Sequence, residues 1–369
     1  MPPKVPLVSI LNSLGGGQIV LEKSPEINET SGTSSGIRSA DSTGNLPGGQ
    51  GDRVLFFHSQ VTHPWDIYFL LVGIPGLEHE QIWISIPFCI TYILALLGNL
   101  MVVVVIFMSP RLHQPMFIFL SMLALNDGLL CTSFAPKILS IFWFSDRAIS
   151  FNGCLLQMFF IHAFTSIESG FLLSMAYDRY VAIYKPLRYT SIITSRLILR
   201  LVIILLVRAV VLVGPCLILI KRFRAFKTNI IVHSYCEHMV VVKLADADIQ
   251  ANSIFGLSSA FIIVGGDLLS IFLSYIMIFS AVFRLPSKEA RLKVFNTCTP
   301  HICVFLSFYN MALFSFLSHR YGKKIPPYIH IIFSDIYLLV PPMLNPLIYG
   351  TKTNLIRQEI WKILKILRF

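Results

Sequence analysis

Seven long apolar stretches constrain this chain more than any other feature. Short polar segments separate them, and they lie at about residues 84–108, 116–139, 155–181, 197–220, 254–283, 294–318 and 328–350. Each is long enough to cross a hydrocarbon core about 30 Å thick as a helix. A backbone at that depth has no water to bond, so it must satisfy its own hydrogen bonds. The sequence therefore predicts an all-α membrane protein, a bundle of seven transmembrane helices followed by a short amphipathic helix.

The composition supports a membrane protein. Of the 369 residues, 55% are hydrophobic and only 13% are charged, whereas a soluble domain carries about 25% charged residues. The net charge of +11 comes from basic residues in short segments between the apolar stretches. That pattern fits contact with anionic lipid headgroups. We therefore expect membrane lipids, and not nucleic acid, to be the partners of these charges.

Three regions differ in kind. Residues 1–65 contain the Ser-, Gly- and Thr-rich stretch "ETSGTSSGIRSADSTGNLPGGQGD" and are expected to be a disordered extension. Asn28 opens an Asn-Glu-Thr sequon, whose glycosylation is left open. Residues 66–352 hold the seven stretches. Residues 353–369 place apolar side chains on one helical face and are expected to lie in the membrane interface.

Basic residues in the connecting segments set an expected orientation. One set of segments is rich in Lys and Arg and poor in acids: Arg111, Lys185, Arg188, Arg196, Arg284, Lys288, Arg291, Lys293, Lys352 and Arg357. The positive-inside rule places this set in the cytoplasm. Seven crossings then put the N-terminus outside and the C-terminus inside, in the plasma membrane. Cys154 and Cys236 fall on the outer side and are the disulfide candidates.

Acidic residues inside the stretches are costly and usually face the bundle interior. They are Asp127, Glu168, Asp267 and Asp335. Asp127 and Glu168 have two interpretations at this point: they share a proton or a cation, or they form a polar contact that only holds helices together.

The sequence contains no recognisable catalytic constellation. It has no GxSxG elbow, no HExxH and no phosphate-binding Gly loop, and its cysteines do not have zinc-ligand spacing. We therefore expect neither an enzyme nor a bound metal or cofactor. A transporter is a distant alternative, because many transporters show two related halves and no such repeat is visible here.

Six motifs, in order, resemble those of the rhodopsin-like receptors coupled to G proteins, and within them the odorant (olfactory) receptors. They are Gly98-Asn99, "LHQPMF" from Leu112, "MAYDRYVAI" from Met175 with "PLRY", "SYIMI" from Ser274, "KVFNTCTPH" from Lys293 and "PPMLNPLIYG" from Pro341. The stretch "LLVGIPGLEH" from Leu70 resembles the class I, or fish-like, branch.

The resemblance implies a function. It implies a receptor in the cilia of olfactory sensory neurons that binds a small odorant, best guessed as a carboxylic acid, in the outer half of the bundle. It also implies that a stimulatory G protein of the olfactory type then raises cyclic AMP. The alternative is a related receptor for an endogenous metabolite outside the nose.

The resemblance also implies roles for polar residues along the bundle. The residues expected to form the switch and its G-protein contact are Asp178, Arg179, Tyr180, Tyr275, Tyr309, Asn345, Pro346 and Tyr349, with Asn99, Asp127 and Glu168 as the intramembrane polar set. Arg179 is expected to leave Asp178 on activation. Tyr184 stands where the family usually has cysteine, and no proline follows Tyr309.

The expected ligand residues lie in the outer half of the bundle. Arg320 is the best candidate, because a guanidinium clamps a carboxylate with two hydrogen bonds; the alternative is an arginine reaching toward the interface. His162 is a second donor or a core histidine, and Asp335 either pairs with Arg320 or repels an acid. Met158, Phe316 and Leu313 have two interpretations, an apolar wall of the ligand site or ordinary core packing.

Two pairs of positions bear on how the second outer loop is held in place. The resemblance implies a Cys154–Cys236 disulfide that pins this loop over the bundle mouth. The family usually has a further pair of loop cysteines, and here those positions hold Phe226 and Asp246. Their absence leaves the rigidity of the loop open.

Overall fold

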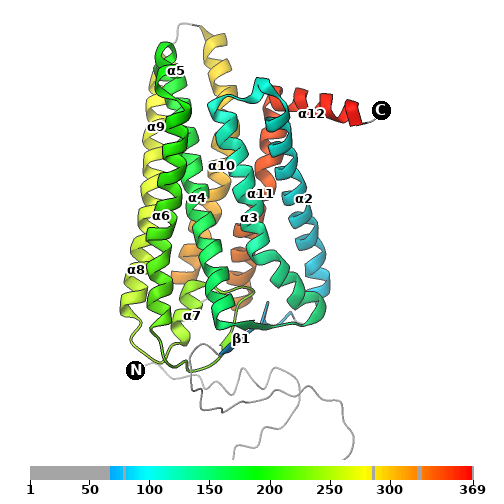
Figure 1. Cartoon of the computed structure of the whole chain (residues 1–369), viewed down its shortest axis with the longest axis vertical. Coiled ribbons are helices and arrows are strands. Elements are labelled where there is room, and N and C mark those ends of the chain that lie inside the picture. The colour runs from blue at the N-terminus through cyan, green and yellow to red at the C-terminus, as the bar shows by residue number, and fades with distance from the viewer. Residues whose placement is uncertain (1–66, 78–79, 285–286, 322–325, 368–369) are drawn as a thin grey trace, which may run out of the picture. The chain divides into compact units, whose positions relative to one another are not determined.

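A computed structural model describes residues 67–77, 80–284, 287–321 and 326–367. The chain divides into two units, Met1–His58 and Ser59–Phe369. The first unit, with the sequon at Asn28, lies outside the described residues. The second contains a bundle of long helices that run roughly side by side (Figure 1).

Seven segments of the described chain are long and apolar enough to cross a membrane, as the sequence predicts. The helices that form them are α2 (Gln81–Met108), α3 (Pro115–Phe144), α4 (Phe151–Tyr184), α6 (Ser195–Lys221), α8 (Gln250–Ala260) with the π-helical turn η4 (Phe261–Gly265) and α9 (Gly266–Phe283), α10 (Lys288–Tyr321) and α11 (Pro327–Lys352). Several extend past the apolar stretch by a turn or more, because polar residues at a helix end continue the hydrogen-bond ladder into water.

Short elements join the long helices. They are η2 (Pro110–Leu112), η3 (Pro186–Arg188), α5 (Tyr189–Ile192), α7 (His238–Leu244) and α12 (Asn354–Leu367), with the strands β1 (Tyr68–Leu71), β2 (Ala148–Ser150) and β3 (Ile230–Ile231). Figure 1 shows α12 leaving the bundle at a steep angle to α11, at the end opposite β1. These two ends are called the α12 end and the strand end below.

A three-stranded sheet covers the strand end. Its order is β2-β1-β3, with β1 antiparallel to β2 and parallel to β3. The disulfide between Cys154 at the start of α4 and Cys236 is present, with a Cα–Cα distance of 5.5 Å. The loop between α6 and α8 is therefore fastened to the bundle by a covalent bond and a strand.

The positions of the missing loop cysteines are joined by backbone pairing. Phe226 forms an antiparallel bridge with Ala245. The Asp246 backbone amide donates to the Ala225 carbonyl at 3.0 Å, and the Lys227 backbone amide donates to the Leu244 carbonyl at 2.8 Å. The Phe226 ring also contacts Phe69 and Phe151. Hydrogen bonds and aromatic packing thus hold together two segments that a second disulfide would otherwise join.

A glycine allows the first and last crossing helices to approach closely. A Cβ at Gly98 would lie 2.7 Å from Cγ of Pro346, which is closer than van der Waals contact allows. One residue along, the Asn99 amide donates to the Pro342 carbonyl at 2.8 Å. The motif residues Gly98, Asn99 and Pro346 therefore act together in packing α2 against α11.

Candidate functional site

A cavity of about 660 Å³ lies between the helices at the strand end. Its wall is mostly apolar and comes from α4, α6, α8, η4, α10 and α11, including Leu212, Leu257 and Leu313. The loop carrying α7 contributes Tyr235 and His238. A concave, mainly apolar cavity with a few polar groups is typical of a small-molecule site, for which about 300–1,000 Å³ is usual.

Two histidines form the polar part of the cavity. The rings of His162 on α4 and His238 on α7 lie edge to face, 6.4 Å apart. The Nε2 atom of each is buried and has no hydrogen-bond partner among the described residues. Burial lowers the pKa of His238, with Glu237 opposing the shift, so its imidazole is neutral near pH 7. Each ring can therefore exchange one hydrogen bond with a ligand.

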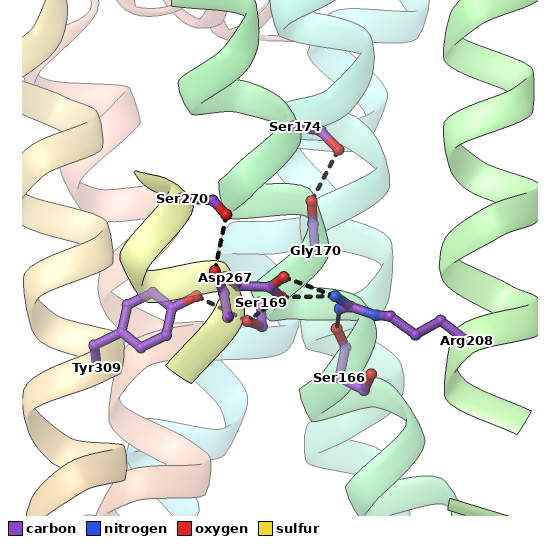
Figure 2. A network of polar contacts seen from close by, with 9 residues as sticks. Ser166, Ser169, Gly170, Ser174, Arg208, Asp267, Ser270 and Tyr309 are labelled. Atoms are coloured by element: carbon purple, nitrogen blue, oxygen red, sulfur yellow. Dashed lines mark hydrogen bonds and ion pairs between the residues drawn. The ribbon is translucent and has the colours of Figure 1, made fainter. Parts of the chain in front are cut away.

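An ion pair joins α6 to α9 close to residues that line the cavity (Figure 2). Nη1 of Arg208 on α6 is 2.8 Å from both carboxylate oxygens of Asp267 on α9. Ser169 Oγ on α4 donates to Asp267 Oδ2 at 2.6 Å and lies 2.8 Å from Oη of Tyr309 on α10. Four crossing helices thus meet in one polar network.

The network touches the cavity wall at three points. Nη2 of Arg208 donates to the carbonyl of Ser166, which lines the cavity. The turn η4 also lines it, and Asp267 follows this turn by two residues. Leu313 lies one helical turn after Tyr309. The network and the cavity wall are therefore adjacent through shared backbone, and π-helical turns are frequent at functional sites.

The carboxylates in the middle of the bundle do not bond to each other. The Asn345 amide donates to Asp127 Oδ2 at 2.8 Å. Asp127 Oδ1 and both Glu168 oxygens are buried without a hydrogen-bond partner in the described structure. Buried acceptors are almost always satisfied, so these three oxygens can accept a proton or a cation. No cluster of three or more His, Cys, Asp or Glu with metal-site geometry occurs among the residues described.

At the α12 end, Asp178 and Arg179 form an ion pair through Asp178 Oδ2. The other oxygen, Oδ1, accepts a hydrogen bond of 2.7 Å from Oη of Tyr189 on α5. The Asp178 side chain is completely buried. Both of its oxygens are therefore engaged, one by its neighbour in sequence and one by the loop that follows α4.

A second contact at this end joins α10 to α11. Tyr349 Oη lies 3.2 Å from Nδ1 of His301, and both residues are buried. The Tyr275 hydroxyl on α9 is buried and unpartnered among the described residues. Among the described residues, none of these three side chains is bonded to Arg179.

Comparison with known proteins identifies the chain at this point. The family model described as olfactory receptor matches residues 88–366. The chain belongs to the olfactory receptor family. Human olfactory receptor 52A1 is 56% identical over 293 residues, covering 79% of this chain and 94% of the relative. Human olfactory receptor 52A5 is 53% identical over 296 residues, covering 80% and 94%.

Family membership fixes the general character of the protein. The receptor is a rhodopsin-like, multi-pass membrane protein and not an enzyme. Human olfactory receptor 52K2 is 51% identical over 300 residues, which is 81% of this chain and 95% of the relative. The similarity therefore extends over nearly the whole length of these relatives.

The structure separates the predicted ligand residues of this olfactory receptor into three groups. His162 and Leu313 line the cavity. Met158 is wholly buried in the core beneath the sheet, with Phe151 and Cys236, and it is not among the residues that line the cavity; this matches the alternative of an ordinary core residue. The side chains of Arg320 and Phe316 lie outside the described residues, so their roles stay predictions.

Asp335 has a partner that the sequence did not suggest. It is buried, and its Oδ1 accepts a hydrogen bond of 2.6 Å from Ser234 Oγ. It therefore fastens the loop between α6 and α8 to α11. Asp335 is absent from the cavity lining, although its neighbour Ser334 is part of it.

Three residues of the polar contacts described above escaped the sequence analysis. Arg208 was detectable, because a lone arginine in the middle of the apolar run "LLVRAVV" needs a buried partner. His238 and Tyr189 were not, since both lie in connecting segments whose packing no local pattern predicts. Tyr184 also gains an explanation, because its ring stacks on Tyr180 at 5.3 Å and 20°.

Proposed function

We propose that this receptor binds a small carboxylic acid in the cavity between α4, α6, α8 and α10. The single observation that carries the proposal is the cavity itself, which has an apolar wall and two buried imidazoles with unused Nε2 atoms. A neutral imidazole donates to a carboxylate, and the wall accommodates a short alkyl chain. Lys243 adds a positive charge to the lining. Arg320, near the end of α10, is proposed as a further hydrogen-bond donor to the ligand carboxylate.

The signal is proposed to reach the α12 end through the Asp267 network. A ligand against Ser166 and η4 shifts the balance of contacts around Arg208 and Asp267, and Tyr309 transmits this shift to α10. Ligand binding favours one of two bundle arrangements only if it binds them unequally. The active arrangement is proposed to separate His301 from Tyr349 and Arg179 from Asp178. The opened end then receives a stimulatory G protein of the olfactory type.

The orientation follows the same proposal. The α12 end faces the cytoplasm, and the strand end with its disulfide faces outward, in the plasma membrane of olfactory cilia. The basic segments at the α12 end support this orientation. An epitope at the N-terminus that antibodies reach only after permeabilisation would contradict it.

Asp127 and Glu168 are proposed to share a proton or a monovalent cation. Their three unpartnered oxygens support this role. Replacing sodium by choline in the assay medium is expected to change the ligand-free signal of the wild type and to leave that of Glu168→Gln unchanged. The same change in both proteins would point to a purely structural role.

The ligand class is tested in cells that carry the olfactory stimulatory G protein. Dose responses to acids, and to alcohols and amines of equal chain length, are compared by cyclic AMP. Acids are expected to activate the wild type, and Arg320→Ala and His162→Phe to raise the concentration needed by tenfold or more. Arg179→Ala is expected to abolish signalling at unchanged surface expression. Acid responses that survive both pocket substitutions would overturn the proposal.

A further inference from the structure

A groove of about 390 Å³ lies between the last turns of α11 and the start of α12. Leu347, Ile360 and Trp361 supply its apolar sides, and Gly350 lies between them. Leu347 is 50% exposed and Trp361 is 60% exposed. The groove therefore opens outward, from a membrane-spanning helix and at the level where the chain turns into α12. Tryptophan is enriched at this depth of a bilayer.

The depth of the groove depends on Gly350. A Cβ built there would have Ile360 Cδ1 as its nearest neighbour, at 3.9 Å. A larger side chain at this position would occupy the space between α11 and α12. The absence of a larger side chain at Gly350 thus contributes to the opening.

One wall of the groove is cationic. Arg357 lines it and is exposed. Its Nη2 donates to Asn354 Oδ1 at 2.8 Å, which leaves other guanidinium N–H groups available. Lys352, at the end of α11, is exposed as well. The carboxylate in α12, Glu359, is already bound by Lys362 and lies 4.0 Å from Arg111.

We propose that this groove binds an anionic phospholipid. Its acyl chain lies against Leu347, Ile360 and Trp361, and its phosphate accepts hydrogen bonds from Arg357. An apolar channel that ends at an unneutralised guanidinium matches the two halves of such a molecule. Arginine is well suited to phosphate because its donors form a planar fork. The excess positive charge at Lys352 and Arg357 favours an anionic headgroup over a zwitterionic one.

The test uses the purified full-length receptor in detergent, titrated with phosphatidylserine or phosphatidylcholine of equal acyl chains. Bound lipid is counted by native mass spectrometry. The wild type is expected to prefer phosphatidylserine by about fivefold or more, since one basic residue near an anionic headgroup contributes about that factor. Arg357→Gln is expected to remove the preference. Lys365→Gln is the matched control, because it removes an exposed charge from α12 outside the groove.

Two outcomes of the charge experiment overturn the proposal. Equal losses of the phosphatidylserine preference in Arg357→Gln and Lys365→Gln would show that the lipid is attracted to the overall charge of α12 and not to the groove. An unchanged preference in both would show that neither charge takes part. Competition by inorganic phosphate at the same concentration as the lipid would also overturn it, because the headgroup alone would then be sufficient.

A second variant tests the apolar half without changing charge. Gly350→Leu fills the groove and is expected to weaken binding of both lipids several-fold, whereas Gly350→Ala keeps it, because its Cβ only reaches ordinary contact distance. Thermal unfolding of both variants checks that the bundle is intact. Undiminished lipid binding in Gly350→Leu would show that no acyl chain occupies the groove. If Gly350→Leu does not fold, the Arg357→Gln comparison decides the matter.

Discussion

Arg208 on α6 holds Asp267 on α9 through a single guanidinium nitrogen that lies 2.8 Å from both carboxylate oxygens. Each side chain is largely buried, with 19% of Arg208 and 7% of Asp267 exposed. The pair lies beside the cavity and is bonded to Ser169 and, through it, to Tyr309. This contact therefore connects the fourth and fifth crossings to the helix that is proposed to move.

Removing one charge of this pair is expected to lower the stability of the receptor more than removing both charges. Arg208→Gln and Asp267→Asn each leave an uncompensated buried charge, which typically costs about 3–5 kcal/mol. The double variant is expected to recover a part of that loss. Thermal unfolding of the purified receptor measures all three, and surface expression in cells provides an independent reading. Losses that simply add in the double variant would show that the two residues do not act as a pair.

Tyr189→Phe is expected to raise signalling without ligand. The substitution keeps the ring and removes the hydrogen bond to Asp178, and bonds to charged groups contribute about 1.5–3 kcal/mol. If that bond stabilises only the inactive arrangement, its loss raises the active population about tenfold or more. Cyclic AMP without ligand, normalised to surface receptor, is the measurement. Tyr184→Phe is the control, since this exposed tyrosine stacks on Tyr180 through its ring, and an equal rise there would argue against the Asp178 bond.

Acid is expected to loosen the loop that covers the cavity. Burial lowers the pKa of His238, so the unfolded chain takes up a proton before the folded one does as the pH falls below about 6.5. Stability is therefore complete above that pH and declines below it. His162 on α4 faces His238, Glu237 precedes it on its own segment, and Lys243 lines the same cavity.

The measurement is the unfolding temperature at pH 7.5, 6.5 and 5.5. His238→Asn is expected to show a smaller decline with acid than the wild type. His113→Asn serves as the control, because His113 is exposed at the opposite end, and it is expected to behave as the wild type does. Identical declines in all three proteins would assign the effect to other groups.

Removal of the disulfide is expected to destabilise the receptor. Cys154 and Cys236 are 82 residues apart in sequence, and losing a native disulfide typically costs about 2–5 kcal/mol. Cys154→Ser and Cys236→Ser are expected to lower surface expression and the unfolding temperature equally, and the double variant no further. Cys303→Ser, which changes an exposed free thiol, is the control. A double variant clearly worse than either single one would show that each cysteine has a separate role.

The polar contacts at the α12 end involve residues that the motifs singled out, namely Asp178, Arg179 and Tyr349. At the strand end, the Cys154–Cys236 bridge is present as the resemblance implied. The cavity at the strand end was predicted less well: Met158 packs in the core, Asp335 bonds to the loop between α6 and α8, and His238 was missed. A cavity wall depends on the rotation of several helices, whereas a motif is a local string of residues.

The sequence by itself determined the seven crossings and the family, because hydrophobic length and ordered motifs are properties of contiguous residues. Only the tertiary structure decided which polar groups meet: Arg208 with Asp267, Tyr189 with Asp178, and His162 with His238. Each of these contacts joins two different elements. Helix packing brings such residues together, and burial at low dielectric makes their pairing strong enough to matter.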